Sequence, residues 1–178
     1  MEFINKQIHE MSLPQLEEVS LIRISKHYFK IIAFNKLLLY GVLFVLWFFA
    51  QRFLDNEFIQ RNISYIGFIL LVVCICDFAI SYVAFKKRQY AVRTHDIIYA
   101  KGLLTYSITT VPISRIQHIE ESRSWLARQL KVSTLKIYTA GESGSDLSIK
   151  GLPEEKAKEI NNFISSKVNG DNGLFTTH

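Results

Sequence analysis

The sequence predicts a membrane protein, with an N-terminal two-helix transmembrane hairpin followed by a small β-sandwich or barrel that a C-terminal α-helix closes. Three observations carry this prediction. Two long apolar runs lie in the first half of the 178 residues, short alternating runs fill the second half, and one amphipathic pattern follows them. Hydrophobic residues make up 49% of the chain and charged residues 21%, which is the opposite of the balance found in disordered proteins.

Two segments, at about 31–50 and 63–85, are apolar enough to cross a membrane. A helix over 63–85 would measure roughly 34 Å, against a hydrocarbon core of about 30 Å. Each span contains one charged residue, Lys36 in the first and Asp77 in the second. An ionisable residue in a span indicates a functional site by default, with a structural carboxyl as the alternative for Asp77. Lys36 is its expected charge partner.

Basic residues around the spans predict the orientation. The connection at 51–62 balances two basic residues with two acidic ones, and Arg23, Lys26 and Lys30 precede the first span. A denser basic cluster follows the second span, at Lys86, Lys87, Arg88 and Arg93. Because an excess of Lys and Arg marks the cytoplasmic side, we expect a multi-pass protein of the bacterial cytoplasmic membrane with both termini inside. The cluster is also expected to attract anionic lipid of the inner leaflet, with a plain topology anchor as the alternative.

The two ends of the chain are expected to contribute little to the core. Residues 1–30 are interpreted as a cytoplasmic head with a formal charge of zero. An interfacial helix in this head could be built from Leu13, Leu16, Val19 and Ile24, and a frayed terminus is the alternative for residues 1–12. Residues 169–178 are interpreted as a disordered tail.

Residues 86–168 are expected to form the β-rich domain. Alternating runs predict strands at 90–93, 97–104, 106–113, 115–121, 134–140 and 147–150. Pro153 should open the closing helix, because proline suits the first helical position and the acidic Glu154 and Glu155 follow in the first turn. Apolar residues at helical spacing continue from Ala157 to Val168, and Gly170 fits the end of the helix.

No residue pattern points to catalysis, a cofactor or a metal. The five histidines are scattered, and the loop at 141–146 lacks the lysine and following helix of a phosphate-binding loop. A hydrolase would need an arrangement such as His118, Glu120 and Asp146 in one cleft. Beyond residue 93, ten Lys and Arg accompany nine Asp and Glu without a basic stripe, which argues against nucleic-acid binding.

Several residues of a recognisable motif lie between 111 and 160: Arg115, Gln117, Arg128, Thr139, Gly141, Ser143, Gly144, Ser145, Asp146, Gly151 and Pro153. With these residues the segment resembles the bacterial pleckstrin-homology-like (PH-like) domain membrane proteins of the YdbS type. The resemblance covers roughly 30–168, and the chain departs from it at Glu142, where relatives often have glycine. It implies two transmembrane helices, a cytoplasmic PH-like domain closed by a C-terminal helix, and no catalytic residues.

The resemblance also suggests a role. It implies a non-enzymatic membrane-anchored module that mediates protein–protein assembly, as a homo-oligomer or with a larger PH-like membrane relative, in envelope stress or antimicrobial-peptide tolerance. The alternative is a subunit of a small oligomeric transport or pore complex that uses Asp77 and Lys36. The turn Thr94-His95-Asp96 carries no Lys or Arg, so a PH-like fold does not by itself imply headgroup binding there.

Overall fold

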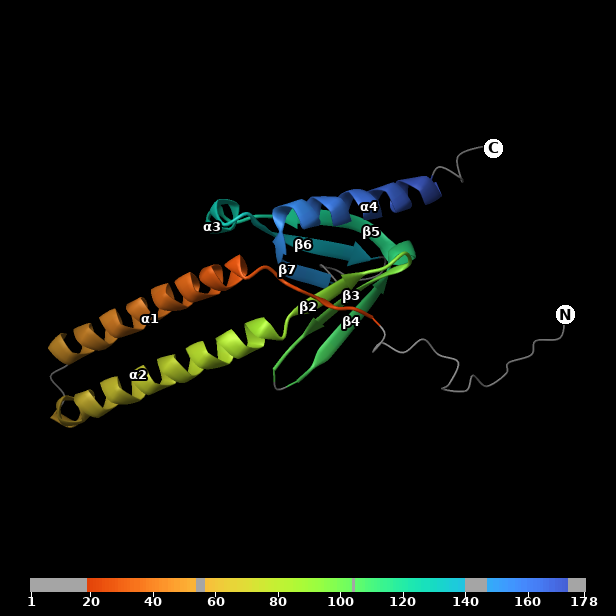
Figure 1. Cartoon of the computed structure of the whole chain (residues 1–178). Coiled ribbons are helices and arrows are strands. Elements are labelled where there is room, and N and C mark those ends of the chain that lie inside the picture. Colours follow the sequence, from red (N-terminus) through yellow and green to blue (C-terminus); the bar gives the residue numbers. More distant parts are fainter. Residues whose placement is uncertain (1–18, 54–56, 104, 140–146, 173–178) are drawn as a thin grey trace, which may run out of the picture.

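In the computed structural model, two long helices extend side by side from a β-domain, and a third long helix lies across that domain (Figure 1). The structure describes residues 19–53, 57–103, 105–139 and 147–172. Leu13 and Leu16 of the proposed interfacial helix, and the last six residues of the proposed tail, lie outside these ranges.

The helices α1 (His27–Phe53) and α2 (Glu57–Lys86) form the antiparallel hairpin. Each contains an 18-residue window of high mean hydropathy, 2.0 in α1 and 2.5 in α2, and only 6% of that window is buried in the structure. Both helices extend beyond the predicted spans, so residues 51–53 and 57–62 of the expected connection are helical. No glycine or proline interrupts these flanks, and the helical hydrogen bonds therefore continue beyond the apolar run.

Trp47 and Gly67 hold the two helices of the hairpin close together. The indole Nε1 of Trp47 donates a hydrogen bond of 3.1 Å to the backbone carbonyl of Ile63. A methyl group at Gly67 would lie 2.5 Å from the Trp47 ring, so only glycine leaves room for the indole. This is the close approach that small residues permit between transmembrane helices.

The β-domain contains two antiparallel sheets. The first has the order β1-β2-β3-β4, with β1 at Ile22–Arg23, β2 at Gln89–Val92, β3 at Asp96–Lys101 and β4 at Ser107–Pro112. The second has the order β5-β6-β7, with β5 at Ile116–Ser122, β6 at Val132–Thr139 and β7 at Leu147–Pro153. The short helices η3 (Ile113–Arg115) and α3 (Trp125–Gln129) precede β5 and β6.

Strand β1 shows that the end of the expected cytoplasmic head forms part of the β-domain. Ile22 and Arg23 pair with Tyr90 and Gln89 of β2, and the side chain of Ile24 is only 5% exposed. An interfacial helix that includes Ile24 is therefore wrong. The segment directly before α1 is an edge strand of the β-domain, because burial of Ile24 in the core removes more apolar surface from water than an interfacial position would.

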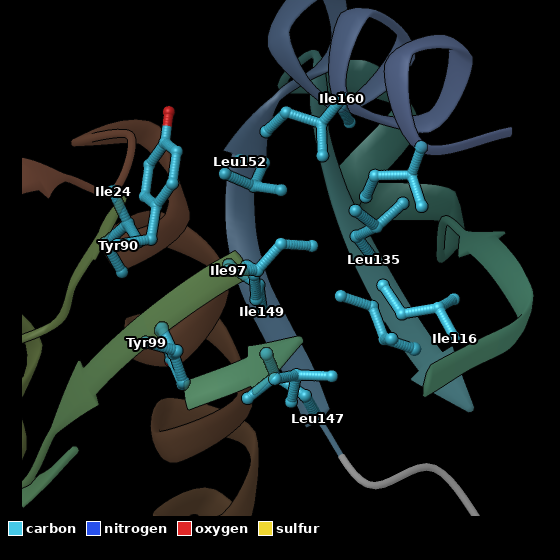
Figure 2. Close-up of a cluster of buried hydrophobic side chains, with 14 of the residues drawn as sticks. Ile24, Tyr90, Ile97, Tyr99, Ile116, Leu135, Leu147, Ile149, Leu152 and Ile160 are labelled. Carbon is cyan, nitrogen blue, oxygen red and sulfur yellow. The ribbon is translucent and has the colours of Figure 1, made fainter. Parts of the chain in front are cut away.

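The core lies between the two sheets and under α4 (Glu154–Asn172), as Figure 2 shows. Its largest fully buried side chains come from both sheets and from the helix: Ile97, Leu135, Ile137, Ile149, Leu152 and Ile164. This is the predicted sandwich closed by a C-terminal helix. The helix continues through Gly170 to Asn172, so a disordered tail from residue 169 is wrong for residues 169–172. One glycine costs a helix only about 1 kcal/mol relative to alanine.

Candidate functional site

Gly151 joins the membrane hairpin to the β-domain. Its carbonyl accepts a hydrogen bond of 2.8 Å from the backbone N–H of Ser25, immediately before α1. Its φ of +85° is rare for any residue with a side chain, and a methyl group there would lie 2.6 Å from Cγ of Tyr28. The motif glycine is therefore needed because the backbone of β7 passes directly beneath the first turn of α1.

A small apolar cluster next to Gly151 extends this joint. Ile31 of α1, Ala127 of α3 and Val132 of β6 are each at most 9% exposed and pack together with Tyr28. Helix α3 is fixed at its start by Ser124, whose hydroxyl accepts a bond of 3.3 Å from the N–H of Ala127. Together these contacts hold the start of α1 against β6, β7 and α3.

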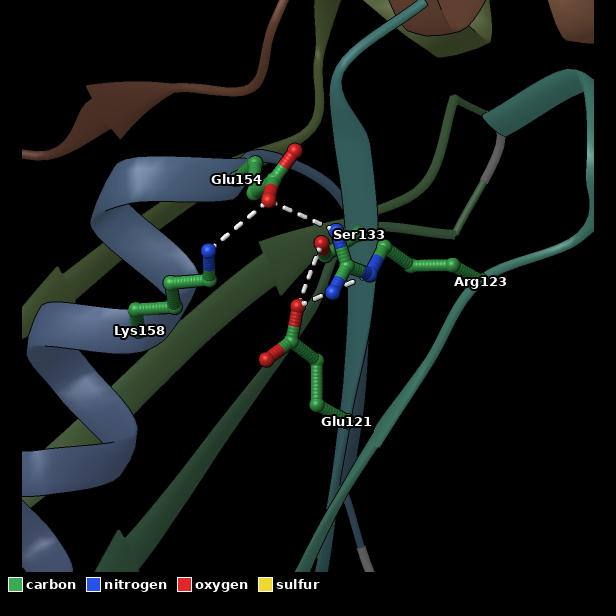
Figure 3. A network of polar contacts seen from close by, with 5 residues as sticks. All are labelled: Glu121, Arg123, Ser133, Glu154 and Lys158. Carbon is green, nitrogen blue, oxygen red and sulfur yellow. Dashed lines mark hydrogen bonds and ion pairs between the residues drawn. The ribbon is translucent and has the colours of Figure 1, made fainter. Parts of the chain in front are cut away.

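A polar network links the chain around α3 to the start of α4 (Figure 3). Arg123 contacts Glu154 at 2.7 Å and Glu121 at 3.3 Å, and Glu121 accepts a bond of 2.8 Å from the hydroxyl of Ser133. Hydrogen bonds from Lys158 and Arg123 hold the pKa of Glu154 below its ordinary value. Two basic and two acidic side chains neutralise one another in this network, which indicates a structural role.

A pocket of about 640 Å³ lies at the base of the hairpin, where α1 begins and α2 ends. Its charged lining residues are all basic: Arg23, Lys26, Lys86 and Arg88. The structure thus brings two residues of the predicted basic cluster together with two from the segment before α1. The sequence placed all four near the inner membrane face, but only the β1–β2 pairing shows that they surround one space.

Arg93 and Lys87 do not belong to this pocket. Arg93 lies beyond the far end of β2, about 13 Å along the strand from its start, and its Nε donates a bond of 2.6 Å to Asp96. Hydrogen bonding to Arg93 lowers the pKa of the Asp96 carboxyl. Lys87 is exposed beside the pocket but does not line it.

Within the hairpin, Asp77 contacts both Lys36 and Tyr40. The Lys36 ammonium forms an ion pair with the Asp77 carboxylate, and the Tyr40 hydroxyl donates a bond of 2.5 Å to the same oxygen. The two intramembrane charges therefore meet across the helices, as expected from the sequence. Tyr40 is not predicted as a member of this cluster from the sequence, although it lies one helical turn after Lys36 on the same face.

Of the hydrolase arrangement named from the sequence, His118 and Glu120 are among the described residues. Asp146 lies outside them, as do Gly141, Ser143, Gly144 and Ser145 of the motif. Glu120 accepts bonds of 2.9 Å from Lys136 and from the hydroxyl of Tyr138, and these bonds lower its pKa. A carboxylate held ionised in this way is a poor general acid. In the described residues no three His, Cys, Asp or Glu side chains gather as a metal site would require.

The remaining motif residues have structural surroundings. Arg115 ends η3 with an exposed side chain, Gln117 lies at the bulge of β5, and Arg128 is exposed on α3. Thr139, at the end of β6, faces Ile116 across the sheet. Pro153 ends β7 and directly precedes α4, one residue from its predicted place in the helix.

Comparison with known proteins agrees with this architecture. The model of the bacterial PH domain family matches residues 36–168, which is more than half of the chain. The chain is also 31% identical over 96 residues to the UPF0699 transmembrane protein YdbS of Bacillus subtilis (strain 168), covering 54% of this chain and 58% of that protein. No solved structure matches the chain. With its two apolar helices and PH-like sheets, the chain is a membrane protein that belongs to the bacterial PH domain family.

Proposed function

We propose that this protein is a non-catalytic, membrane-anchored PH-like module that mediates protein–protein assembly at the inner face of the bacterial cytoplasmic membrane. Both termini lie in the cytoplasm in this proposal, because the basic residues gather where the hairpin meets the β-domain. The partner is a second copy of the chain or a larger PH-like membrane protein, and the assembly serves tolerance of envelope stress or antimicrobial peptides.

The free edge of β4 is the observation that carries this proposal. Among the described residues, β4 is hydrogen-bonded only to β3 and forms one edge of its sheet. The strand runs from Ser107 to Pro112 without a charged residue, and Ile108 is 39% exposed. Natural proteins usually protect such an edge with charge, a bulge or a covering element, and an unprotected edge is suited to pairing with another strand.

The alternation of hydrogen bonds between β3 and β4 shows which backbone N–H groups of β4 are not bonded to β3. The N–H of Ile113 bonds to the carbonyl of His95 at 2.9 Å, in the same register as the rest of the ladder. Hydrogen-bonded pairs alternate along an antiparallel ladder, so Val111 and Thr109 also bond to β3. The backbone N–H groups of Ile108 and Thr110 therefore point away from the sheet and are available to a partner strand.

Thr110→Pro tests this assignment because proline removes one outward donor and leaves the β3 ladder bonds in place. Thr110→Val is the matched control, since it keeps the N–H and suits a strand. After gentle detergent extraction and cross-linking, we expect the wild type and the valine variant to give the same complex, and the proline variant to lose it. A proline variant that assembles as the wild type does, or a wild type that is strictly monomeric without a co-purifying chain, would refute the proposal. Intact-mass analysis of the complex separates a homo-oligomer from a hetero-complex.

The Asp77 carboxylate supports a second candidate function. Its side chain remains 42% exposed on the hairpin despite its contact with Lys36. In an oligomer such a charge pair could face a shared polar path, and the chain would then be a subunit of a small transport or pore complex. The pairing of both charges within one hairpin favours the simpler role of holding α1 against α2.

A further inference from the structure

The four basic residues of the pocket at the base of the hairpin make no ion pair within the described ranges of the chain. Two come from the segment before α1, Arg23 and Lys26, and two from the end of α2 and the turn after it, Lys86 and Arg88. Like charges brought together in this way repel one another. An anion bound between them would remove that repulsion and use the hydrogen-bond donors of both guanidinium groups.

Aromatic side chains form the opposite part of the same pocket. Phe29 lies between Tyr82 and Phe85, with ring centroids 5.1 and 5.4 Å away. All three rings line the pocket. The Lys86 ammonium lies 4.3 Å from the centre of the Tyr82 ring, so the basic and the aromatic residues of the pocket are in contact with each other. A ligand that fills this pocket needs an anionic end and an apolar end.

The position of the pocket indicates which kind of molecule with an anionic end and an apolar end could reach it. It lies where α1 begins at His27 and α2 ends at Lys86, the level at which two membrane-spanning helices leave the hydrocarbon. Phospholipid phosphates lie at this level, and the acyl chains lie alongside the helices. The volume of about 640 Å³ falls within the roughly 300–1,000 Å³ of small-molecule sites.

We propose that this pocket binds one anionic phospholipid of the inner leaflet, with its phosphate among Arg23, Lys26, Lys86 and Arg88 and its glycerol and upper acyl carbons against Phe29, Tyr82 and Phe85. The site differs from the loop at Thr94-His95-Asp96, which lies at the far end of β2. The inference is independent of the assembly proposal, because the pocket lies at β1 and the free edge belongs to β4, and these are the two opposite edge strands of the first sheet.

Native mass spectrometry of the full-length chain in detergent tests this site. Phosphatidylglycerol and phosphatidylcholine are added at equal concentration, and we expect one phosphatidylglycerol molecule to remain bound in preference. The double variant Arg23→Gln/Lys26→Gln removes two of the proposed charge-assisted contacts with the phosphate, so it should weaken phosphatidylglycerol binding by about 30-fold or more. Both side chains are exposed, so the variant should fold as the wild type does.

The matched control is Lys30→Gln/Lys87→Gln, which removes the same charge at the same membrane level from two exposed residues outside the pocket. Its binding should change by less than about threefold, because only general attraction to the surface is lost. Equal losses in the two double variants, or equal retention of phosphatidylcholine, would overturn the proposal. Millimolar inorganic phosphate should leave the lipid bound, and its displacement by phosphate would overturn the assignment to a lipid.

Discussion

Gly151→Ala is the substitution that most directly tests how the hairpin is attached to the β-domain. The added methyl group would lie 2.6 Å from Cγ and 2.8 Å from Cβ of Tyr28, well inside van der Waals contact. It would also sit on a backbone with φ of +85°, which costs an L-residue about 1–2 kcal/mol. Overpacking costs a further 1–3 kcal/mol or so. We therefore expect the variant to lose about 2–5 kcal/mol of stability.

The assay is thermal unfolding of the full-length protein in detergent, followed by circular dichroism. For a chain of this size 1 kcal/mol corresponds to about 2–4 °C, so the midpoint should fall by on the order of 10 °C. Gly41→Ala is the control, because a methyl group at Gly41 has no atom within 4 Å. Its midpoint should not fall.

A double variant separates the two causes of the loss. In Tyr28→Ala/Gly151→Ala the clash with the ring atoms disappears, while the contact with Cβ of residue 28 and the backbone strain remain, so the combined loss should be smaller than the sum of the two single losses. A Gly151→Ala midpoint within 2 °C of the wild type would refute the argument that this glycine permits the close approach of α1 to β7.

Two further predictions concern charged residues, and a third concerns the orientation of the chain in the membrane. Asp77→Asn should destabilise the hairpin because it leaves the Lys36 ammonium without its carboxylate, and Lys36→Met/Asp77→Leu should restore most of the thermal midpoint. If the double variant restores stability but still loses the tolerance phenotype, the transport alternative gains support; a normal phenotype removes it. The pKa of Glu154 is lowered in the folded state, so the unfolded state binds more protons as the pH falls. Stability from this group should be complete above about pH 4.5 and decline below it, and Glu154→Gln should make that decline shallower in acid unfolding curves. A cysteine at Asn56 should react with an impermeant thiol reagent in whole cells and one at Ser143 should not, and the opposite pattern would reverse the proposed topology.

The sequence predicts the elements of this fold that leave a periodic pattern. The spans are evident from their length, and β6 from the alternation of Leu135 and Ile137 with polar neighbours. Strand β1 is missed because two residues, Ile22 and Arg23, are too few to show alternation. Its existence depends on pairing with β2, which lies beyond both transmembrane helices in the chain.

The candidate site likewise contains some residues that the sequence predicts and some contacts that it does not. Charge clustering identifies Lys86 and Arg88, and the rule for ionisable residues in spans identifies Asp77 and Lys36. The contact between Tyr28 and Gly151 leaves no local signal, because the two residues are far apart in the chain and only the tertiary structure brings them together. Arg93 is close to Arg88 in the sequence, which therefore predicts it in the same basic cluster. The extended strand β2 lies between the two residues, so Arg93 lies away from the pocket that Arg88 lines.

The joint and the pocket together explain how assembly could depend on the membrane. The Ser25–Gly151 bond and the Tyr28 contact hold the β-domain at β7, and a lipid in the pocket would hold it at β1, the edge of the first sheet opposite β4. Neighbouring strands lie about 4.8 Å apart, so the β1 and β4 edges are separated by roughly 14 Å of continuous sheet. Two attachment points on one rigid domain restrict its rotation about the hairpin. The outward N–H groups of Ile108 and Thr110 would then face partners at one fixed height above the membrane. If this orientation matters, Gly151→Ala should weaken the cross-linked complex although it leaves the β4 edge intact. A complex that survives Gly151→Ala and is lost only in Thr110→Pro would show that the edge suffices without it.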